Sequence, residues 1–272
     1  MADLLIHSMA EFWPVIEGAL HIAEARDIVE IGAEFGGMSE RLAAHAEQMD
    51  GRLTCIDPAP MPQFLDWVSE HREVRHVAEP SLSAIDGLDA PDAWFVDGDH
   101  NWYTVYHELQ AIDRVTRAAG KPMLVFFHDV GWPWGRRDLY YAPDRIPAEY
   151  RHPYSYEDGV TLGRSSLLPG GGFRGCGAYA CARHEGGPRN GVLTAIEDFR
   201  AEAGRDLVFA EVPAVFGLGI LFDATAPWAE ALGRALLPYH KHPLLASLEQ
   251  NRLANYLRVI ALQDEIALKE AA

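Results

Sequence analysis

The sequence predicts an α/β protein with a doubly wound, mostly parallel sheet, and three observations lead to this fold class. Short apolar runs alternate with longer segments of helical spacing through the first half of the chain. Two further apolar runs follow a helical segment later in the chain. The chain has 272 residues, of which 49% are hydrophobic, so it can bury a sizeable core.

The first five predicted strands are short and show little polar alternation. They are 27–31, 53–56, 74–77, 93–96 and 123–127. Because such runs are typical of strands buried on both faces, we expect a parallel sheet. The segments between them carry apolar residues at three- or four-residue steps, as helices do. These residues are Met38, Leu42 and Ala46, and then Val105, Leu109, Ile112 and Val115.

Residues 129–190 have a different character, because they combine prolines and glycines with many Trp and Tyr side chains. A stretch this long without predicted secondary structure is unusual in a compact domain and is typical of a functional lid. The aromatic content favours a lid, since large rings need packing partners. An ordinary insertion is the alternative.

The remaining elements are a helix near 192–203, strands at 207–209 and 218–222, and helices at 228–237 and 243–268. The order of helix, strand and strand predicts an antiparallel hairpin at one edge of the sheet. The last helix carries an apolar stripe that we expect to pack on its own domain, with a dimer interface as the alternative. The stripe consists of Leu245, Leu248, Leu253, Leu257, Ile260 and Leu268.

Composition excludes several classes of function. The formal net charge of −17 argues against nucleic acid and anionic membranes as partners. No apolar run is long enough for a transmembrane helix, and the N-terminal residues lack the pattern of a signal peptide. Three cysteines without a CxxC pair predict neither a disulfide framework nor a structural zinc site. We expect a soluble, cytoplasmic protein.

A glycine-containing turn follows the first predicted strand, in the segment VEIGAEFGGMS. Gly32 ends the strand, and Gly36 and Gly37 open the next helix, whose N–H groups could bind an anion. Asp57 ends the second strand, where doubly wound folds place a carboxylate that accepts ribose hydroxyls. Together these residues predict a cofactor that bears adenosine. The alternatives are a tight turn and a turn carboxylate before Pro58.

A second polar group follows the fourth and fifth strands, at Asp97-Gly98-Asp99-His100 and at His128-Asp129. Neighbouring parallel strands would bring Asp97, His128 and Asp129 together as ligands of a divalent cation. His100 could accept a proton near neutral pH. Alternatively, Asp97 or Asp99 caps the following helix, and His128 is a core histidine.

These motifs resemble the class I S-adenosylmethionine-dependent methyltransferases, and among them a bacterial group of sugar O-methyltransferases and cephalosporin-hydroxylase-like proteins. The resemblance extends over 24–223. The motifs are VEIGAEFGGMS, LTCIDP, AWFVDGDHNWYTVYHEL, FFHDV, GVLTAIEDFRAE and FGLGILFD. The resemblance implies a Rossmann-like sheet of seven strands with a reversed last strand.

The resemblance also implies roles for individual residues. It implies that S-adenosylmethionine is bound by Glu30, Gly32, Gly36, Ser39, Asp57, Ser81 and Asp97. Metal-dependent members place a metal ligand where Asp97 stands and a base where His100 stands, so both are candidate catalytic residues. The positions of the remaining metal ligands read His128 and Asp129, for Mg²⁺ or another divalent cation.

We therefore expect one methyltransferase domain over residues 1–272. Its parts are a cofactor-binding half (24–128), a substrate lid (129–190), a helix with antiparallel edge strands (191–223) and C-terminal helices (226–270). The expected reaction is metal-assisted methylation of a hydroxyl on a small sugar, glycoside or natural product, with homo-oligomerisation possible through the last helix. A metal-free N- or O-methyltransferase, a metal-dependent oxygenase or hydrolase, and a non-catalytic interaction protein are alternatives.

Overall fold

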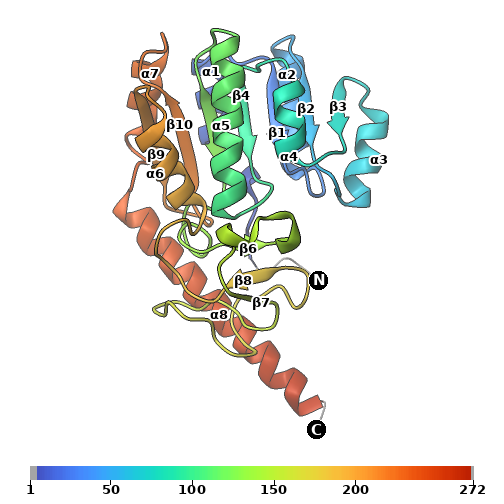
Figure 1. Cartoon of the computed structure of the whole chain (residues 1–272), viewed down its shortest axis with the longest axis vertical. Coiled ribbons are helices and arrows are strands. Elements are labelled where there is room, and N and C mark those ends of the chain that lie inside the picture. The colour runs from blue at the N-terminus through green and yellow to red at the C-terminus, as the bar shows by residue number, and fades with distance from the viewer. Residues whose placement is uncertain (1–4, 271–272) are drawn as a thin grey trace.

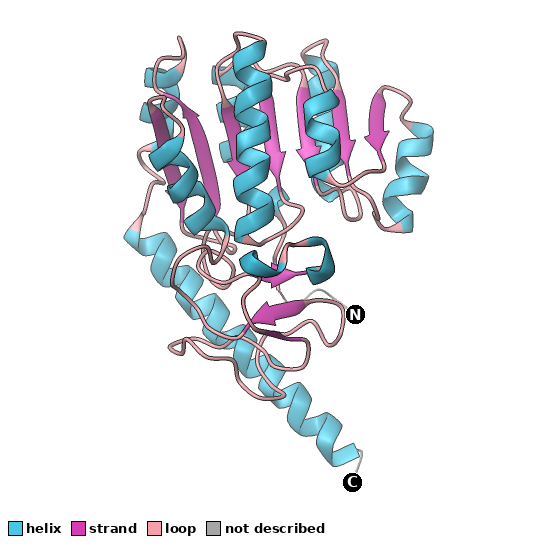
Figure 2. Ribbon diagram, in the orientation of Figure 1, coloured by secondary structure: helices cyan, strands magenta, loops and turns pink. Residues whose placement is uncertain are grey.

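The computed structural model describes residues 5–270 and contains a seven-stranded sheet flanked by helices (Figures 1 and 2). The strand order is β3-β2-β1-β4-β5-β10-β9. The strands are β1 (Ile28–Ile31), β2 (Leu53–Ile56), β3 (Val74–Val77), β4 (Ala93–Val96), β5 (Leu124–Phe127), β9 (Leu207–Val212) and β10 (Leu218–Asp223). The predicted doubly wound fold is confirmed, with the strand bounds close to those expected.

The first five strands pair in parallel, while β10 is antiparallel to both β5 and β9. The predicted hairpin is therefore present, and β9 forms the sheet edge. Strands β1, β4, β5 and β10 are buried at every position, which explains their nearly continuous apolar sequences.

Helices cover both faces of the sheet. They are α1 (Trp13–Ile22), α2 (Gly37–Gln48), α3 (Pro62–Glu70), α4 (Ser81–Ala84), α5 (Trp102–Ala118), α6 (Val192–Glu202), α7 (Ala229–Leu236) and α8 (Pro243–Glu270), with short 3₁₀ turns at Met9–Phe12, Ile85–Gly87, Pro143–Arg145 and Ala148–Tyr150. One core lies between the sheet and α1, α2 and α7, and another between the sheet and α5 and α6. Alternate strand residues such as Phe95 and Trp94 enter the two cores in turn.

The segment 129–190 is more ordered than the sequence predicted. It contains a second sheet of three short strands, β6 (Leu139–Tyr140), β7 (Tyr154–Ser155) and β8 (Ala180–Ala182), in the order β6-β8-β7. Most of its aromatic side chains pack inside it or against α5. We call this segment the insertion. Its glycines and prolines mark turns between strands, which is why single-sequence patterns missed the sheet.

Helix α8 begins below the main sheet and extends past the insertion, away from that sheet (Figure 1). Its predicted stripe packs on the domain in part, through Leu245 and Leu253. Leu253 is buried, whereas Leu248 is 58% and Leu268 is 73% exposed. The face that contacts the body combines apolar contacts of Leu245 and Leu253 with hydrogen bonds made by Glu249, Arg252 and Asp264. Oligomerisation through α8 stays a prediction.

The structure also bears on membrane-spanning helices and on the cysteines. Over residues 5–270, no helix is long and apolar enough to cross a membrane. Cys55, Cys176 and Cys181 are free thiols, of which Cys176 is exposed. The division of the chain into four parts stays a prediction.

Candidate functional site

The turn after β1 crosses the point where the sheet order reverses, between β1 and β4. Gly32 has a φ of 89°, and a Cβ atom built on it would lie 2.3 Å from the Asp97 carbonyl oxygen. Only glycine therefore fits where the β1 and β4 chain ends meet. Ligands of doubly wound folds bind in the crevice outside such a switch point.

The N-terminus of α2 faces out of the same turn. Gly36 is its N-cap residue, with a φ of 90°, and no side chain caps the helix. The first N–H groups of a helix have no partner within the helix, and the helix dipole makes that end attractive to anions. The turn therefore offers main-chain donors to an anionic group of a ligand.

Asp57 lies at the end of β2 and holds this turn in place. Its Oδ2 accepts hydrogen bonds from the N–H groups of Ala33 at 2.9 Å and Glu34 at 3.2 Å, and its Oδ1 accepts one from Ala59 at 2.9 Å. The sequence suggested a ribose-binding carboxylate or a turn residue. The turn role is present, and each carboxylate oxygen retains acceptor capacity for a ligand.

Glu30 and Ser39, both predicted to bind cofactor, are joined beneath the turn. The Ser39 hydroxyl donates to Glu30 Oε2 at 2.5 Å, and the Cys55 thiol donates to the same oxygen at 3.1 Å. Glu30 and Ser39 are 2% and 0% exposed. Burial raises the pKa of Glu30 to about 7. These two residues support the turn from within the core.

Ser81, the predicted adenine-site residue, lies at the start of α4. Its hydroxyl donates to Oε1 of Glu108 at 2.5 Å. Glu108 is 1% exposed, its Oε2 has no hydrogen-bond partner among the described residues, and burial raises its pKa to about 8. Glu108 was not among the predicted site residues, although a carboxylate on the apolar face of α5 was a visible signal.

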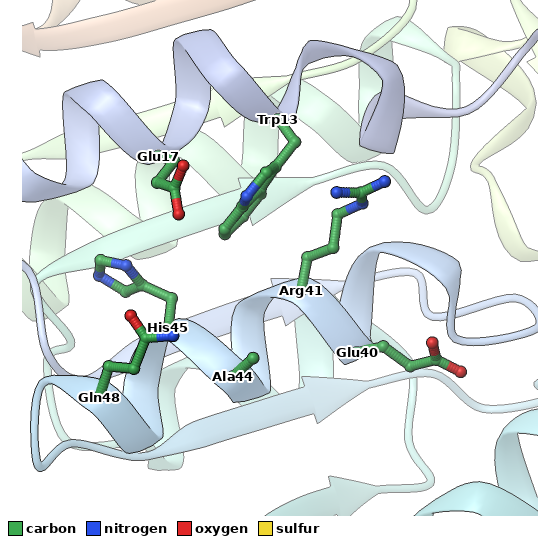
Figure 3. A pocket seen from close by; sticks show the side chains of 7 residues that line it. All are labelled: Trp13, Glu17, Glu40, Arg41, Ala44, His45 and Gln48. Carbon is green, nitrogen blue, oxygen red and sulfur yellow. The ribbon is translucent and has the colours of Figure 1, made fainter.

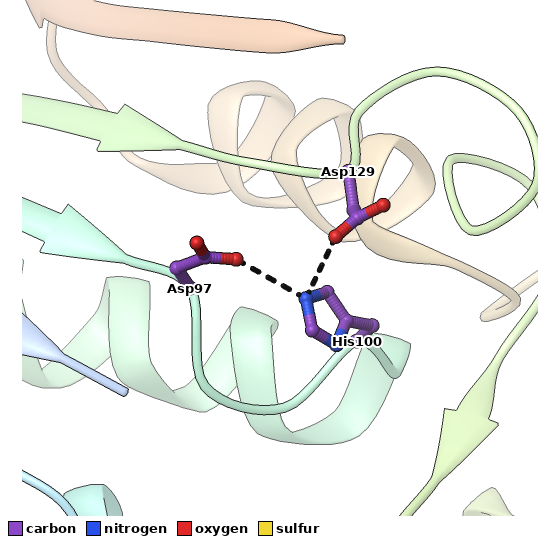
Figure 4. Close-up of side chains that lie close together, drawn as sticks. All are labelled: Asp97, His100 and Asp129. Atoms are coloured by element: carbon purple, nitrogen blue, oxygen red, sulfur yellow. Dashed lines mark hydrogen bonds and ion pairs between the residues drawn. The ribbon is translucent and has the colours of Figure 1, made fainter. Parts of the chain in front are cut away.

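The strongest constellation lies at the ends of β4 and β5. His100 Nε2 lies 2.9 Å from Asp129 Oδ2 and 3.3 Å from Asp97 Oδ1 (Figure 4). His128 Nδ1 lies 3.4 Å from each of the same two oxygen atoms. We call these four residues the His–Asp cluster. The strand ends bring together every residue that the sequence placed in the metal site, and also His100.

Charges within the His–Asp cluster shift the pKa values of its side chains. Burial alone would lower the pKa of His128, but the facing carboxylates of Asp97 and Asp129 outweigh it and raise the pKa to about 9. Burial opposes protonation of His100 as well, yet the same carboxylates, Asp129 above all, raise its pKa. Burial would raise the pKa of Asp97, but the two imidazoles hold it at about 2. Opposite charges therefore stabilise one another within the cluster.

Local backbone structure positions the residues of the His–Asp cluster. Asp129 has a φ of 58°, a left-handed conformation that is uncommon for residues other than glycine and is frequent at functional sites. The side chain of Asn101, rather than Asp97 or Asp99, caps α5 by accepting a hydrogen bond from the Thr104 N–H. Asp97 is thus free of the capping role that the sequence left open.

The His128 ring is fixed from the far side by a turn that the sequence did not single out. Its Nε2 lies 2.9 Å from the carbonyl oxygen of Val215. Val215 and Phe216 have left-handed φ values of 42° and 65°, and their N–H groups donate to the Glu249 carboxylate of α8. Nothing in the local sequence connects Glu249 with the fifth strand.

The insertion reaches the cluster at one edge. The Leu139 N–H of β6 donates to the His100 carbonyl oxygen at 3.0 Å. The half-exposed ring of Tyr141 lies 6.2 Å from the His100 ring, between centroids. Tyr141 is thus a surface that an acceptor bound near the cluster could contact.

A separate cavity of about 320 Å³ lies between α1 and α2 (Figure 3). Its lining residues are Trp13, Glu17, Glu40, Arg41, Ala44, His45 and Gln48. None of these residues belongs to the predicted site. The candidate functional site therefore remains the one at the strand ends, apart from this cavity.

Comparison with known proteins gives one family match, over part of the chain. Residues 29–130 match the family model of a methyltransferase domain. The match extends from β1 to the residue after Asp129, and so contains the glycine turn, Asp57 and the His–Asp cluster. No curated protein matches the sequence. The predicted resemblance to methyltransferases is confirmed over this segment.

Solved structures give weaker likenesses. A Staphylococcus aureus protein assigned as a caffeoyl-CoA O-methyltransferase is 13% identical with a TM-score of 0.47, over 80% of this chain and 85% of the other. The O-methyltransferase TomG of Streptomyces achromogenes, solved with S-adenosylmethionine, is 17% identical with a TM-score of 0.46, over 82% and 83%. The Podospora anserina methyltransferase PaMTH1 is 13% identical with a TM-score of 0.46, over 81% and 80%.

Proposed function

We propose, from the premise that residues 29–130 form a methyltransferase domain, that the chain transfers a methyl group from S-adenosylmethionine to an oxygen atom of a small molecule. One observation carries this proposal. The Gly32 turn and the His–Asp cluster meet at the switch point of the sheet, where Gly32 touches the Asp97 backbone. A cofactor in the turn would therefore lie beside the cluster.

The hydrogen-bond donors and acceptors around the Gly32 turn suit S-adenosylmethionine. S-Adenosylmethionine supplies an electrophilic methyl group when it is bound. The uncapped N-terminus of α2 suits the carboxylate of its methionine part. Asp57 keeps acceptor capacity for the ribose hydroxyls while its hydrogen bonds hold the turn. Ser81, joined to Glu108, is the candidate residue for the adenine side of the crevice.

The His–Asp cluster fits a divalent cation by its donor set. Asp97, His128 and Asp129 are the predicted ligands, and the two carboxylates lie within 3.4 Å of His128 Nδ1 and within 3.3 Å of His100 Nε2. The ligand atoms of Asp97, Asp129 and His100 all lie within 4.8 Å of one another. A bound cation would lower the pKa of an acceptor hydroxyl at this place. The cluster is largely buried, so these side chains exclude much of the competing water. The role of His100 as the proton acceptor stays a prediction from the resemblance.

The acceptor is inferred to be a small molecule such as a sugar, a glycoside or a natural product. Tyr141 offers an aromatic surface for a sugar or a ring beside His100. The net charge of −17 disfavours nucleic acid as the acceptor. Most other aromatic residues of the insertion are occupied in packing, so the insertion forms a wall of the site more than a closing lid.

Two other functions use the same residues. A metal-free N- or O-methyltransferase would use the cluster to orient its substrate. A metal-dependent oxygenase or hydrolase is favoured by one observation, since two histidines with carboxylates are common ligands of catalytic iron and zinc. That function leaves the uncapped α2 N-terminus and the Gly32 turn without a role.

Calorimetry with S-adenosylmethionine and S-adenosylhomocysteine tests the proposal. We expect one binding site per chain, and we expect Asp57→Ala to weaken binding at least about tenfold, since it removes a charged acceptor. Asp86→Ala is the control, because Asp86 pairs with Arg114 on the exposed surface. The absence of binding by the folded wild-type chain would contradict the proposal.

Methyl transfer is then measured by mass spectrometry with pooled sugar and phenolic acceptors. We expect chelation of divalent cations to abolish transfer. Transfer that persists after complete chelation and in His100→Ala would instead favour the metal-free methyltransferase.

A further inference from the structure

We propose that the cavity between α1 and α2 is a second ligand site, which binds a small zwitterion of the amino-acid type with a flat apolar side chain. The ammonium group of the ligand would lie at Glu17 and its carboxylate at Arg41, with the apolar part against Trp13. The inference goes beyond the proposed function and does not rest on it, because the lining residues belong neither to the Gly32 turn nor to the His–Asp cluster.

The two helices place opposite charges at separate ends of this cavity. Trp13 and Glu17 are one turn apart on α1, and Arg41 and His45 are one turn apart on α2. The Arg41 guanidinium lies over the Trp13 ring, 5.9 Å from its centroid. The ring centroids of His45 and Trp13 are 6.4 Å apart. Figure 3 shows that the Trp13 ring separates Glu17 from Arg41.

Neither of these charged groups has a partner of its own. In the part of the chain that the structure describes, the side chains of Glu17 and Arg41 make no ion pair or hydrogen bond. Ala44 lines the cavity between them on α2 and carries only a methyl group, which leaves room for a ligand. Opposite charges that are held apart in this way can each pair with one end of a zwitterion.

His45 supplies a second acceptor at the Glu17 end. Its Nε2 lies 2.9 Å from the Ala25 carbonyl oxygen, which only accepts hydrogen bonds, so the ring proton is on Nε2. Burial lowers the pKa of His45, so the neutral ring carries its lone pair on Nδ1. His45 is 2% exposed, and its Nδ1 has no hydrogen-bond partner within residues 5–270. Because an unpaired buried acceptor costs free energy, an ammonium N–H beside Glu17 would be favoured here.

The volume and the surfaces of the cavity limit the class of ligand. A volume of about 320 Å³ is at the small end of the range for ligand sites. The half-buried ring of Trp13 offers an aromatic surface to a flat apolar group. A simple anion would meet the carboxylates of Glu17 and Glu40, and a simple cation would meet Arg41. A zwitterion therefore suits the lining better than either ion.

Calorimetry with three compounds of one carbon skeleton tests the charge requirement. L-Phenylalanine carries both charges, 2-phenylethylamine lacks the carboxylate and 3-phenylpropanoate lacks the ammonium group. We expect L-phenylalanine to bind at one site per chain, at least about tenfold more tightly than either analogue, since each analogue loses a charge-assisted hydrogen bond. Failure of L-phenylalanine to bind, or equal affinities for the three compounds, would overturn the proposal.

Three variants of the lining locate the two ends of the ligand. We expect Glu17→Gln and Arg41→Gln each to weaken L-phenylalanine binding at least about tenfold. Glu17→Gln is expected not to weaken 3-phenylpropanoate, and Arg41→Gln not to weaken 2-phenylethylamine. We expect Ala44→Leu, which fills the space between the ends, to abolish binding of all three compounds. Ala201→Leu, at an exposed position of α6, is the control. Unchanged L-phenylalanine affinity in any of the three lining variants would overturn the site.

The indole N–H signals of the ¹⁵N-labelled wild-type chain show where L-phenylalanine binds. The Trp13 signal is identified by its loss in Trp13→Phe. We expect L-phenylalanine to shift this signal and to leave that of Trp102, which donates to Asp198, in place. A shift at Trp102 with none at Trp13 would overturn the site, even if the lining variants do not fold.

S-Adenosylhomocysteine separates this site from the proposed cofactor site, because it also carries an amino-acid zwitterion. We expect L-phenylalanine to bind equally with and without saturating S-adenosylhomocysteine. Competition between the two compounds would place L-phenylalanine in the Gly32 turn and overturn the second site. If L-phenylalanine binds as expected while S-adenosylhomocysteine does not bind, the second site stands and the proposed function is wrong.

Discussion

Glu249 in the C-terminal helix and His128 at the end of β5 are linked through one main-chain turn. Glu249 accepts hydrogen bonds from the N–H groups of Val215 at 3.0 Å and Phe216 at 2.9 Å, and the Val215 carbonyl faces His128 Nε2 at 2.9 Å. Arg252 donates to both oxygens of Glu249. A residue far along the chain therefore fixes the ring orientation of a candidate metal ligand.

This link makes Glu249 a positioning residue. Glu249→Ala would free a turn that holds Val215, a β-branched residue, at a φ of 42°. We expect unfolding to become easier by about 1–3 kcal/mol, the usual cost of leaving buried N–H groups unpaired. We also expect weaker Co²⁺ binding, because His128 loses its orientation.

Thermal unfolding and calorimetry with Co²⁺ measure these two effects of Glu249→Ala. Gln250→Ala is the control, because Gln250 is the next residue along α8 and its side chain is exposed. We expect this control to leave both the melting temperature and the Co²⁺ affinity unchanged. A loss of stability in Glu249→Ala with unchanged Co²⁺ affinity would contradict the link to the cluster.

Alanine substitutions at two nearby glycines are expected to change the stability of the fold in opposite directions. In Gly32→Ala the new Cβ atom would meet the Asp97 backbone in a left-handed conformation, and we expect a loss of several kcal/mol of stability. A Cβ atom on Gly37 meets nothing within 4 Å, so Gly37→Ala is expected to be neutral or to stabilise by about 0.5–1 kcal/mol. Chemical unfolding measures both, and equal effects would contradict the close approach of β1 and β4.

The buried carboxyl of Glu108 is expected to make the stability of the fold depend on pH. The pKa of this carboxyl is about 8 in the folded chain because of burial, against 4.5 as its ordinary value. Between these values the unfolded chain has lost the proton and the folded chain retains it, so stability falls as pH rises and levels off above about 8. Glu108→Gln keeps an acceptor for Ser81 and removes this titration.

We expect the melting temperature of Glu108→Gln to equal that of the wild type near pH 4.5 and to exceed it by on the order of 5 °C at about pH 8. Glu70→Gln, at an exposed position, is the control. A constant difference between wild type and Glu108→Gln across this pH range would show that Glu108 is ionised in the folded chain.

The insertion is predicted to be a fixed part of the domain. Asp138 accepts hydrogen bonds at 2.7 Å from the N–H groups of Trp102 and Gly191 and from the Tyr140 hydroxyl. Asp138→Ala leaves the two buried N–H groups unpaired, at a cost of about 1–3 kcal/mol each. We expect limited proteolysis to cleave 129–190 quickly in this variant and slowly in the wild type. Equally rapid cleavage in the wild type would indicate a mobile lid.

The sequence was sufficient to predict the main sheet. Five strands and the terminal hairpin were predictable because strands buried on both faces need short apolar runs, and Ile28–Ile31 and Leu124–Phe127 are such runs. It also predicted that Asp97, His128 and Asp129 would meet, since the carboxyl ends of parallel strands share one edge of the sheet.

The surroundings of those residues depend on packing between segments that are distant in the sequence. Single-sequence patterns report periodicity and turns, whereas the contacts of Glu249 with the 215–216 turn and of Glu108 with Ser81 join distant segments. The same limit explains the small sheet of the insertion, whose strands are two or three residues long. The direction of His100 toward two carboxylates arises from packing between β4 and β5, because side-chain orientation depends on neighbours that chain order does not reveal.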